Sequence, residues 1–286
     1  MNSLPIILIG GLGTTTHYME HFCGFMHQYI GTLSDSDPIQ IYNFPLLHGK
    51  TVDEEVAHIL SELASSSSLS ADCIVTYNII GFSAGCSVAL SLAKHLSTHK
   101  IILCNPADIR HRFYAGAVDA IYDYSESLVK TSRFIDSSSC RTVSSSFWFF
   151  FFCLLGIIWN LLIRFNMTET TMLLYHQVFG RRNYNSQYTG LQKNTKMFDE
   201  PFENIAKTIS ECVVKPNLTE MMQPWSHLVN KVHVVYGMYD AYITYIIKLK
   251  AMWIGTNVLF HELKGAHNMI NLNPEMVAQS VYGILY

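Results

Sequence analysis

Apolar positions divide the chain into two blocks in which short apolar runs alternate with amphipathic helical patterns. Apolar runs bounded by turn residues predict buried strands, and a period near 3.6 residues predicts helices. In the first block we predict strands over 4–9, 39–43, 74–80 and 101–104, and helices over 16–30, 51–63 and 86–96. In the second block we predict strands over 232–236 and 258–263, and helices over 242–253 and 274–285.

This alternation predicts the fold class. Continuously apolar strands separated by helices are typical of a parallel sheet that helices cover on both faces. We therefore predict an α/β protein with a mostly parallel six-stranded sheet, built from residues 1–106 and 231–286. Residues 107–230 show no clear strand rhythm and form a predicted insertion between the two parts. Thr51 and Glu54 have the spacing of a capping box at the start of one helix.

The charge balance narrows the class of partner. The 286 residues carry a formal net charge of −3 and the sequence pI is about 6.5. The chain therefore lacks the basic surface with which proteins bind nucleic acid. Charged residues make up only 14% of the chain and aromatic residues 13%, which favours a large apolar interior or a surface that faces lipid.

The cysteines indicate the cellular compartment. There are seven, an odd number, and none forms a C-x-x-C pair. Several lie within apolar strands or helices, so we expect buried free thiols in a reducing compartment.

No residues have the spacing of paired metal ligands, and we expect no metal or cofactor. The apolar run at 3–9 is short and lacks a basic flank, so we expect no secretion signal and a location in the cytoplasm or on the cytoplasmic side of a membrane.

The most informative motif follows the predicted strand over 74–80. There the sequence Gly81-Phe-Ser-Ala-Gly85 leads directly into a helical pattern. A G-x-S-x-G motif between a strand and a helix holds its serine exposed on a tight turn, with glycines that let the backbones pack closely. We therefore predict Ser83 as a nucleophile. The alternative is an ordinary turn of glycine and serine without chemistry.

A nucleophilic serine needs a base and an acid that orients the base. His267 follows the last predicted strand, and a histidine titrates near neutral pH, so we predict it as the base. Asp240 follows the preceding strand and is the predicted orienting acid; its alternative role is a helix cap. Asp108, after the strand over 101–104, is the second candidate for the acid.

With its order Ser83, Asp240, His267, the chain resembles the α/β-hydrolases, in particular the lipase, esterase and monoacylglycerol-lipase-like group. The matching stretches are 7–18, 77–90, 232–240 and 258–286. The resemblance implies an oxyanion hole made by backbone N–H groups of Ala84 and of the loop after the first strand. In that loop Gly11 is the first choice and Leu12 the second.

Two features depart from the family pattern. Ile9 stands where many relatives carry a histidine before the glycines, a residue that supports the loop. The chain also begins at the strand that the family places third, so we do not expect the usual opening hairpin.

The resemblance implies a serine hydrolase that cleaves a carboxylic ester of a small molecule or lipid through an acyl-enzyme. A serine in this motif favours acyl transfer over the reactions of relatives that carry an aspartate there. Two alternatives remain: a transacylase or thioesterase with the same three residues, and a non-catalytic, membrane-associated binding protein.

The segment 147–163 inside the insertion is almost entirely apolar, with Asn160 as its one polar interruption. Its 17 residues are at the lower limit for a membrane-spanning helix. A single crossing would separate Ser83 from Asp240 and His267. We therefore expect the segment to lie in the membrane interface, to re-enter on the same side, or to pack within a helical cap. The family usually places such a cap between the fourth and fifth of the predicted strands, where residues 107–230 lie in this chain.

Overall fold

One six-stranded sheet organises the described part of the chain. The computed structural model describes residues 4–11, 19–31, 39–46, 49–66, 75–107, 207–208, 210–238, 240, 243–265, 267 and 269–286. The strands are β1 (Ile6–Ile9), β2 (Ile41–Phe44), β3 (Thr76–Phe82), β4 (Ser97–Cys104), β5 (Val232–Gly237) and β6 (Leu259–Leu263). Their order is β2-β1-β3-β4-β5-β6, and every neighbouring pair is parallel. The predicted α/β class with a six-stranded sheet is therefore confirmed, and the sheet is wholly parallel over these ranges.

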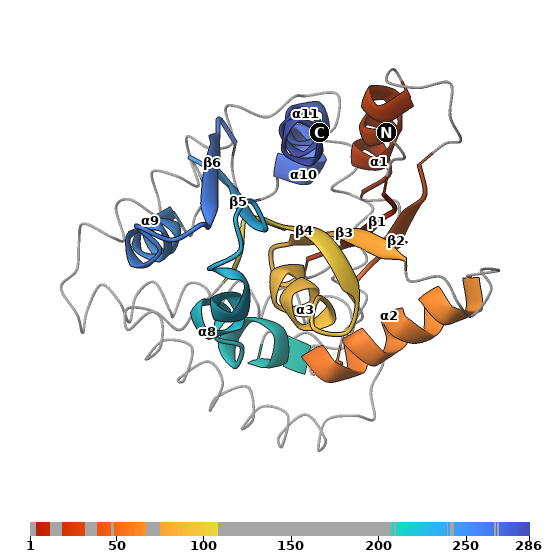
Figure 1. Cartoon of the computed structure of the whole chain (residues 1–286), viewed down its shortest axis with the longest axis horizontal. Coiled ribbons are helices and arrows are strands. Elements are labelled where there is room, and N and C mark those ends of the chain that lie inside the picture. The colour runs from red at the N-terminus through yellow and green to blue at the C-terminus, as the bar shows by residue number, and fades with distance from the viewer. Residues whose placement is uncertain are drawn as a thin grey trace, which may run out of the picture.

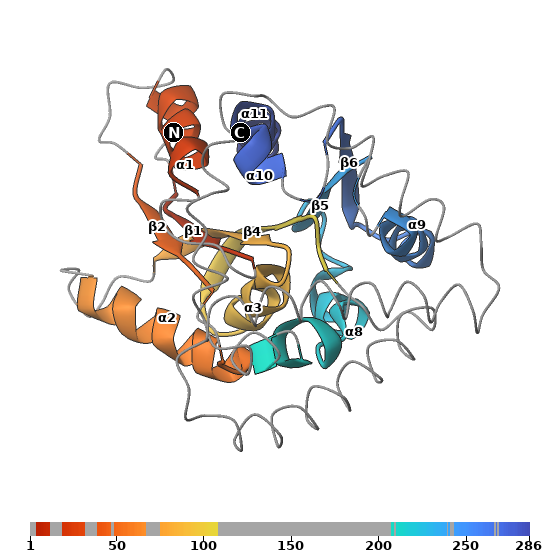
Figure 2. The ribbon, with the colours of Figure 1, turned by 180° about the vertical axis from the view of Figure 1, so that it is seen from behind.

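Helices cover both faces of the sheet, as predicted (Figures 1 and 2). The helices are α1 (Glu20–Gly31), α2 (Val52–Ser66), α3 (Gly85–Leu92), α8 (Leu218–Met222), α9 (Ile243–Met252), α10 (Met269–Leu272) and α11 (Pro274–Leu285). Helices α1, α10 and α11 pack on one face, and α2, α3, α8 and α9 on the other. The predicted capping box begins α2, where Glu54 accepts from the Thr51 backbone N–H at 2.7 Å and the Thr51 hydroxyl accepts from the Glu54 N–H at 3.2 Å.

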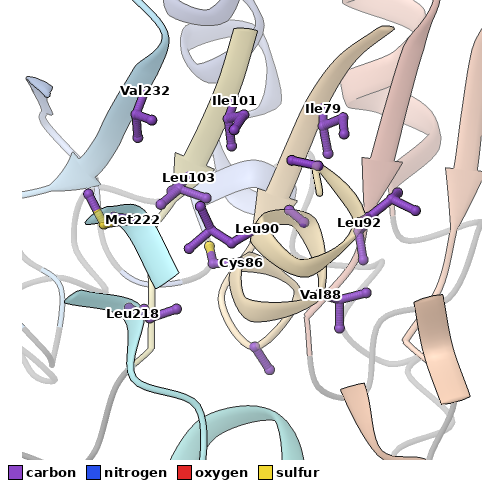
Figure 3. Close-up of a cluster of buried hydrophobic side chains, with 14 of the residues drawn as sticks. Ile79, Cys86, Val88, Leu90, Leu92, Ile101, Leu103, Leu218, Met222 and Val232 are labelled. Carbon is purple, nitrogen blue, oxygen red and sulfur yellow. The ribbon is translucent and has the colours of Figure 1, made fainter. Parts of the chain in front are cut away.

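Strand β1 shows why the predicted strands are continuously apolar. Ile7 and Ile9 belong to the core beneath α2 and α3, whereas Ile6 and Leu8 belong to the core beneath α1 and α11. Because successive side chains of a strand point to opposite faces, a strand covered on both faces needs an apolar residue at each position. Figure 3 shows the first of these cores, where α3 and α8 contribute side chains that meet those of the sheet: Ile79, Ile101, Leu103, Cys86, Val88, Leu90, Leu218 and Met222.

The boundary between α3 and β4 differs from the prediction. The helix ends at Leu92 rather than at residue 96, and the strand begins at Ser97 rather than at residue 101. Its first residues are polar, so their pattern gave no strand signal. They are held by pairing with β3, where Ser97 lies opposite Thr76 and the two hydroxyls are 3.0 Å apart.

The end of the predicted insertion contributes to the core. A π-helical turn at Ser210–Val214 and helix α8 pack beneath α3, where the Ser87 hydroxyl donates to the Cys212 carbonyl at 2.7 Å. Residues 108–206, including the apolar segment 147–163, lie outside the described residues. The helical cap therefore stays a prediction. Within the described ranges, no helix has both the length and the apolar character needed to cross a membrane.

Candidate active site

Ser83 lies on a sharp turn between the end of β3 and the start of α3. Its φ of +53° is in the left-handed region, which residues other than glycine rarely adopt. The Ser83 backbone N–H donates to the carbonyl of Cys104 at the end of β4, at 2.9 Å. The strained turn is therefore fixed to the neighbouring strand, as a strand-to-helix turn that presents a nucleophile requires.

Two glycines allow the loop after β1 to lie directly against this turn. A Cβ on Gly85 would lie 2.3 Å from the Gly10 carbonyl oxygen, and a Cβ on Gly11 would lie 2.8 Å from the Ser83 Cβ. Real Cβ atoms essentially never approach so closely. The structure thus brings Gly11 against Ser83, and Ala84 directly follows Ser83 in the chain. Their role as oxyanion donors stays a prediction. Leu12, the second choice in that loop, lies outside the described residues.

His267 is hydrogen-bonded on both sides. Its Nε2 is 2.8 Å from the Ser83 Oγ, and its Nδ1 is 2.9 Å and 3.1 Å from the two carboxylate oxygens of Asp240. Next to a carboxylate that is ionised and therefore only accepts, we assign the ring proton to Nδ1, which leaves Nε2 to accept from the serine hydroxyl. Asp240 is fully buried, whereas the His267 side chain is 22% exposed. A buried carboxylate therefore orients the imidazole, and the imidazole itself is partly exposed to solvent.

The parallel sheet explains why these three residues meet. Ser83 follows β3, Asp240 follows β5, and His267 follows β6. In a parallel sheet the carboxyl ends of all strands lie along one edge, and loops there form the usual site of open α/β sheets. Asp108, the second candidate for the acid, lies outside the described residues.

Asn105, which no motif in the sequence singles out, also reaches this edge. Its side chain joins the end of β5 to the histidine: the Gly237 N–H donates to Oδ1 at 2.8 Å, and Nδ2 donates to the His267 carbonyl at 2.5 Å. The signal available in the sequence was an asparagine directly after a buried strand, since asparagine tolerates left-handed backbone better than most residues. The φ of Asn105 is +46°.

Two thiols close to the serine are held neutral. Burial raises the pKa of Cys86 well above its usual value and the pKa of Cys104 to about 12. The Cys86 thiol donates to the Gly81 carbonyl at 3.2 Å. Because only a thiolate is strongly nucleophilic, neither cysteine competes with Ser83. The described cysteines are free, and three of them (86, 104 and 212) are buried as expected, whereas Cys23 is partly exposed.

A metal centre is not found in the described ranges. No group of three or more histidine, cysteine, aspartate or glutamate side chains there could hold a metal ion. The described residues bring together a hydroxyl, an imidazole and a carboxylate at this edge.

The sequence matches no protein-family model and no curated protein. The fold, by contrast, matches many solved structures. A hydrolase from Pseudomonas aeruginosa PA01 has a TM-score of 0.60 at 12% identity, over 100% of this chain and 91% of that one. A carboxylesterase structure from Nitrososphaera gargenis has a TM-score of 0.53 at 13% identity, over 99% and 90%.

A third structure of similar fold is a 1H-3-hydroxy-4-oxoquinoline 2,4-dioxygenase, with a TM-score of 0.51 at 10% identity over 100% of this chain and 93% of that one. At such identities the likeness establishes the α/β-hydrolase fold. One fold hosts several reactions, so the reaction has to be argued from the site itself.

Proposed function

We propose that the protein is a serine hydrolase that cleaves a carboxylic ester through an acyl-enzyme intermediate. The observation that carries this proposal is the pair of hydrogen bonds that links the Ser83 hydroxyl to His267 Nε2 and His267 Nδ1 to Asp240. A serine hydroxyl becomes a useful nucleophile only when a neighbouring base takes its proton. The carboxylesterase and hydrolase of similar fold support an assignment to hydrolysis.

In the acylation step the Ser83 Oγ attacks the ester carbonyl carbon while its proton passes to His267 Nε2. Asp240 holds the Nδ1–H and stabilises the imidazolium that forms. The C–O bond to the alcohol then breaks, and the same proton moves from Nε2 to the departing oxygen. Water repeats the sequence in deacylation: it gives a proton to Nε2, attacks the acyl carbon and releases the carboxylic acid, and Ser83 recovers its proton.

The negative charge that develops on the carbonyl oxygen needs fixed donors. We assign these to the backbone N–H groups of Gly11 and Ala84, with Leu12 as the second choice in the loop. Support comes from the close approach of Gly11 to Ser83, and from the place of Ala84 at the N-terminus of α3. The partial positive charge of a helix N-terminus favours an anion there. Such donors typically contribute about 10²- to 10³-fold each to the rate.

The nucleophile assignment is tested with Ser83→Ala. We expect it to abolish ester hydrolysis and labelling by a fluorophosphonate probe, with the fold intact by circular dichroism, because the Ser83 hydroxyl lies 2.8 Å from His267 Nε2 and is the proposed nucleophile. Ser91→Ala is the matched control, since Ser91 lies in α3 and is also largely buried. The control should retain labelling. Undiminished labelling of Ser83→Ala would refute the assignment.

For the substrate we propose an ester with an apolar, lipid-like acyl chain. The support is the composition of segment 147–163, which is apolar and rich in aromatic residues. A segment of this kind suits contact with lipid or with an acyl chain. We further propose that it contacts a membrane surface from the cytoplasmic side. Hydrolysis of p-nitrophenyl esters should therefore improve from acetyl to longer acyl groups, and a preference for acetyl would contradict the lipid-like substrate.

The two alternatives make different predictions. A binding protein that only retains the fold has no need of a serine within 2.8 Å of a histidine ring nitrogen, so this contact argues against it. A transacylase would use the same three residues and differ only in the acceptor of the acyl group. Added alcohols distinguish it from a hydrolase, because a transacylase converts them to new esters in preference to releasing the free acid.

A further inference from the structure

We propose that Asn105 is a positioning residue that holds the histidine loop against the end of β5, so that His267 stays within reach of both Ser83 and Asp240. The proposal rests on the proposed function for its kinetic consequences. Its geometric content is independent of that function.

The first support is the position of the side chain. Asn105 directly follows β4 and is fully buried. Its backbone N–H donates to the Val235 carbonyl at 2.8 Å, which continues the ladder between β4 and β5 by one residue. From there the amide bridges two segments, accepting from the Gly237 N–H at 2.8 Å and donating to the His267 carbonyl at 2.5 Å.

The second support is that residues 104 and 105 contact the backbone around all three members of the site. The Cys104 carbonyl accepts from the Ser83 N–H at 2.9 Å, and Asn105 bonds His267 directly. Asp240 is reached through Gly237, whose carbonyl accepts from the Asp240 N–H at 3.0 Å while its own N–H is bound by Asn105. The junction at the end of β4 therefore fixes the nucleophile, the base and the acid to one another.

The chemistry of the bridge requires an amide. One end must accept from an N–H and the other must donate to a carbonyl, and among side chains that do not titrate only asparagine and glutamine carry both groups on a planar terminus. A carboxylate could accept from Gly237 but, when ionised, would repel the His267 carbonyl. The left-handed backbone also favours asparagine over most other residues, because an ordinary Cβ is strained there.

The test uses Asn105→Gly, because glycine adopts the same backbone without strain and removes the side chain that forms the bridge. We expect kcat to fall about 10- to 100-fold, as small misplacements of catalytic groups commonly cause, with KM unchanged. Asn78→Ala is the matched control: Asn78 is also a buried asparagine, and it bonds His99 from within β3. The control should lose stability and keep kcat, a difference that a purely structural role of Asn105 would not produce.

Crystal structures of the two variants test the geometry without reference to activity. In Asn105→Gly the distance from Ser83 Oγ to His267 Nε2 should exceed hydrogen-bonding range, whereas in Asn78→Ala it should stay at the wild-type value. An unchanged distance and an unchanged kcat in Asn105→Gly would overturn the proposal. If that variant does not fold, Asn105→Asp replaces it, since it keeps the acceptor for Gly237, and wild-type kcat in Asn105→Asp would overturn the proposal equally.

The proposed function can fail separately. If the wild-type protein neither hydrolyses esters nor reacts with the fluorophosphonate probe, the hydrolase assignment is lost, and the two crystal structures still decide whether Asn105 positions His267.

Discussion

At the scale of single residues, Ser83 and Asn105 share a rare backbone conformation, with φ values of +53° and +46°. They stand at the carboxyl ends of the neighbouring strands β3 and β4. Such a conformation costs on the order of 1–3 kcal/mol for each residue and persists only where the surrounding structure imposes it. Serine adopts the left-handed region less readily than asparagine does. The conformation of Ser83 is therefore the stronger sign that the surrounding structure imposes it.

Gly85 is the residue at which a single methyl group would disturb this turn most directly. In Gly85→Ala the new Cβ would lie 2.3 Å from the Gly10 carbonyl oxygen and 2.7 Å from that of Ile9. We expect the loop after β1 to be pushed away from Ser83, with a loss of stability of about 1–3 kcal/mol and loss of esterase activity. Urea denaturation and ester hydrolysis measure the two effects.

Gly24→Ala is the control for this substitution. Gly24 lies within α1, and a Cβ there meets nothing within 4 Å. Alanine is a better helix former than glycine, so the control should gain about 0.5–1 kcal/mol of stability and retain activity. A Gly85→Ala protein as active as Gly24→Ala would contradict the close packing described here.

At the scale of elements, the sequence pattern predicted the strands well because each contains apolar residues. The inner strands β1, β3, β4 and β5 bury most of them, whereas the edge strands β2 and β6 are only partly buried. All six were found, with ends displaced by a few residues. The polar first half of β4 and the turns around α8 were not predicted, because neither has a periodic pattern of apolar residues. Their conformation depends on tertiary contacts, such as the pairing of Ser97 with Thr76 and the bond from Ser87 to the Cys212 carbonyl.

The candidate site was likewise predictable only in part from the sequence. Ser83, Asp240 and His267 could be predicted because each follows a strand in a recognisable order, and parallel strands bring such positions to one edge. Asn105 could not be assigned a role, since its two bonds reach Gly237 and His267, which are remote in the sequence. A bridge between loops leaves no spacing that a reader of the sequence can recognise.

At the scale of the whole molecule, the sheet contains a histidine pair away from the candidate site, of which His233 is buried and His261 is partly exposed. His233 of β5 and His261 of β6 stack with ring centroids 5.2 Å apart, and His233 Nδ1 lies 3.0 Å from His261 Nε2. Burial lowers the pKa of His233 from 6.5 to about 4, with smaller effects of the same sign from His261 and Lys100. Burial also lowers the pKa of His261.

This pair predicts a pH dependence of folding. Because the pKa of His233 is about 4 when folded and near 6.5 when unfolded, the unfolded state binds more protons between these values. Stability should therefore fall as the pH is lowered from about 6.5 towards 4, and this pair should have little effect at higher pH. Urea midpoints measured across that range should change less in His233→Gln than in the wild type.

The exposed His21 of α1 provides the comparison. His21→Gln should leave the dependence of the urea midpoint on pH as it is in the wild type. An equal dependence in His233→Gln and the wild type would show that the buried His233 does not control acid stability.

The pairing of β4 with β5 brings together segments that are far apart in the sequence. Ser83 precedes Asp240 and His267 in the chain and is therefore made before them during translation. A nascent chain carries an ordinary, unreactive alcohol until β5, β6 and the residues after them have emerged and joined the sheet. Under the proposed mechanism, Ser83 acquires its reactivity only at that point.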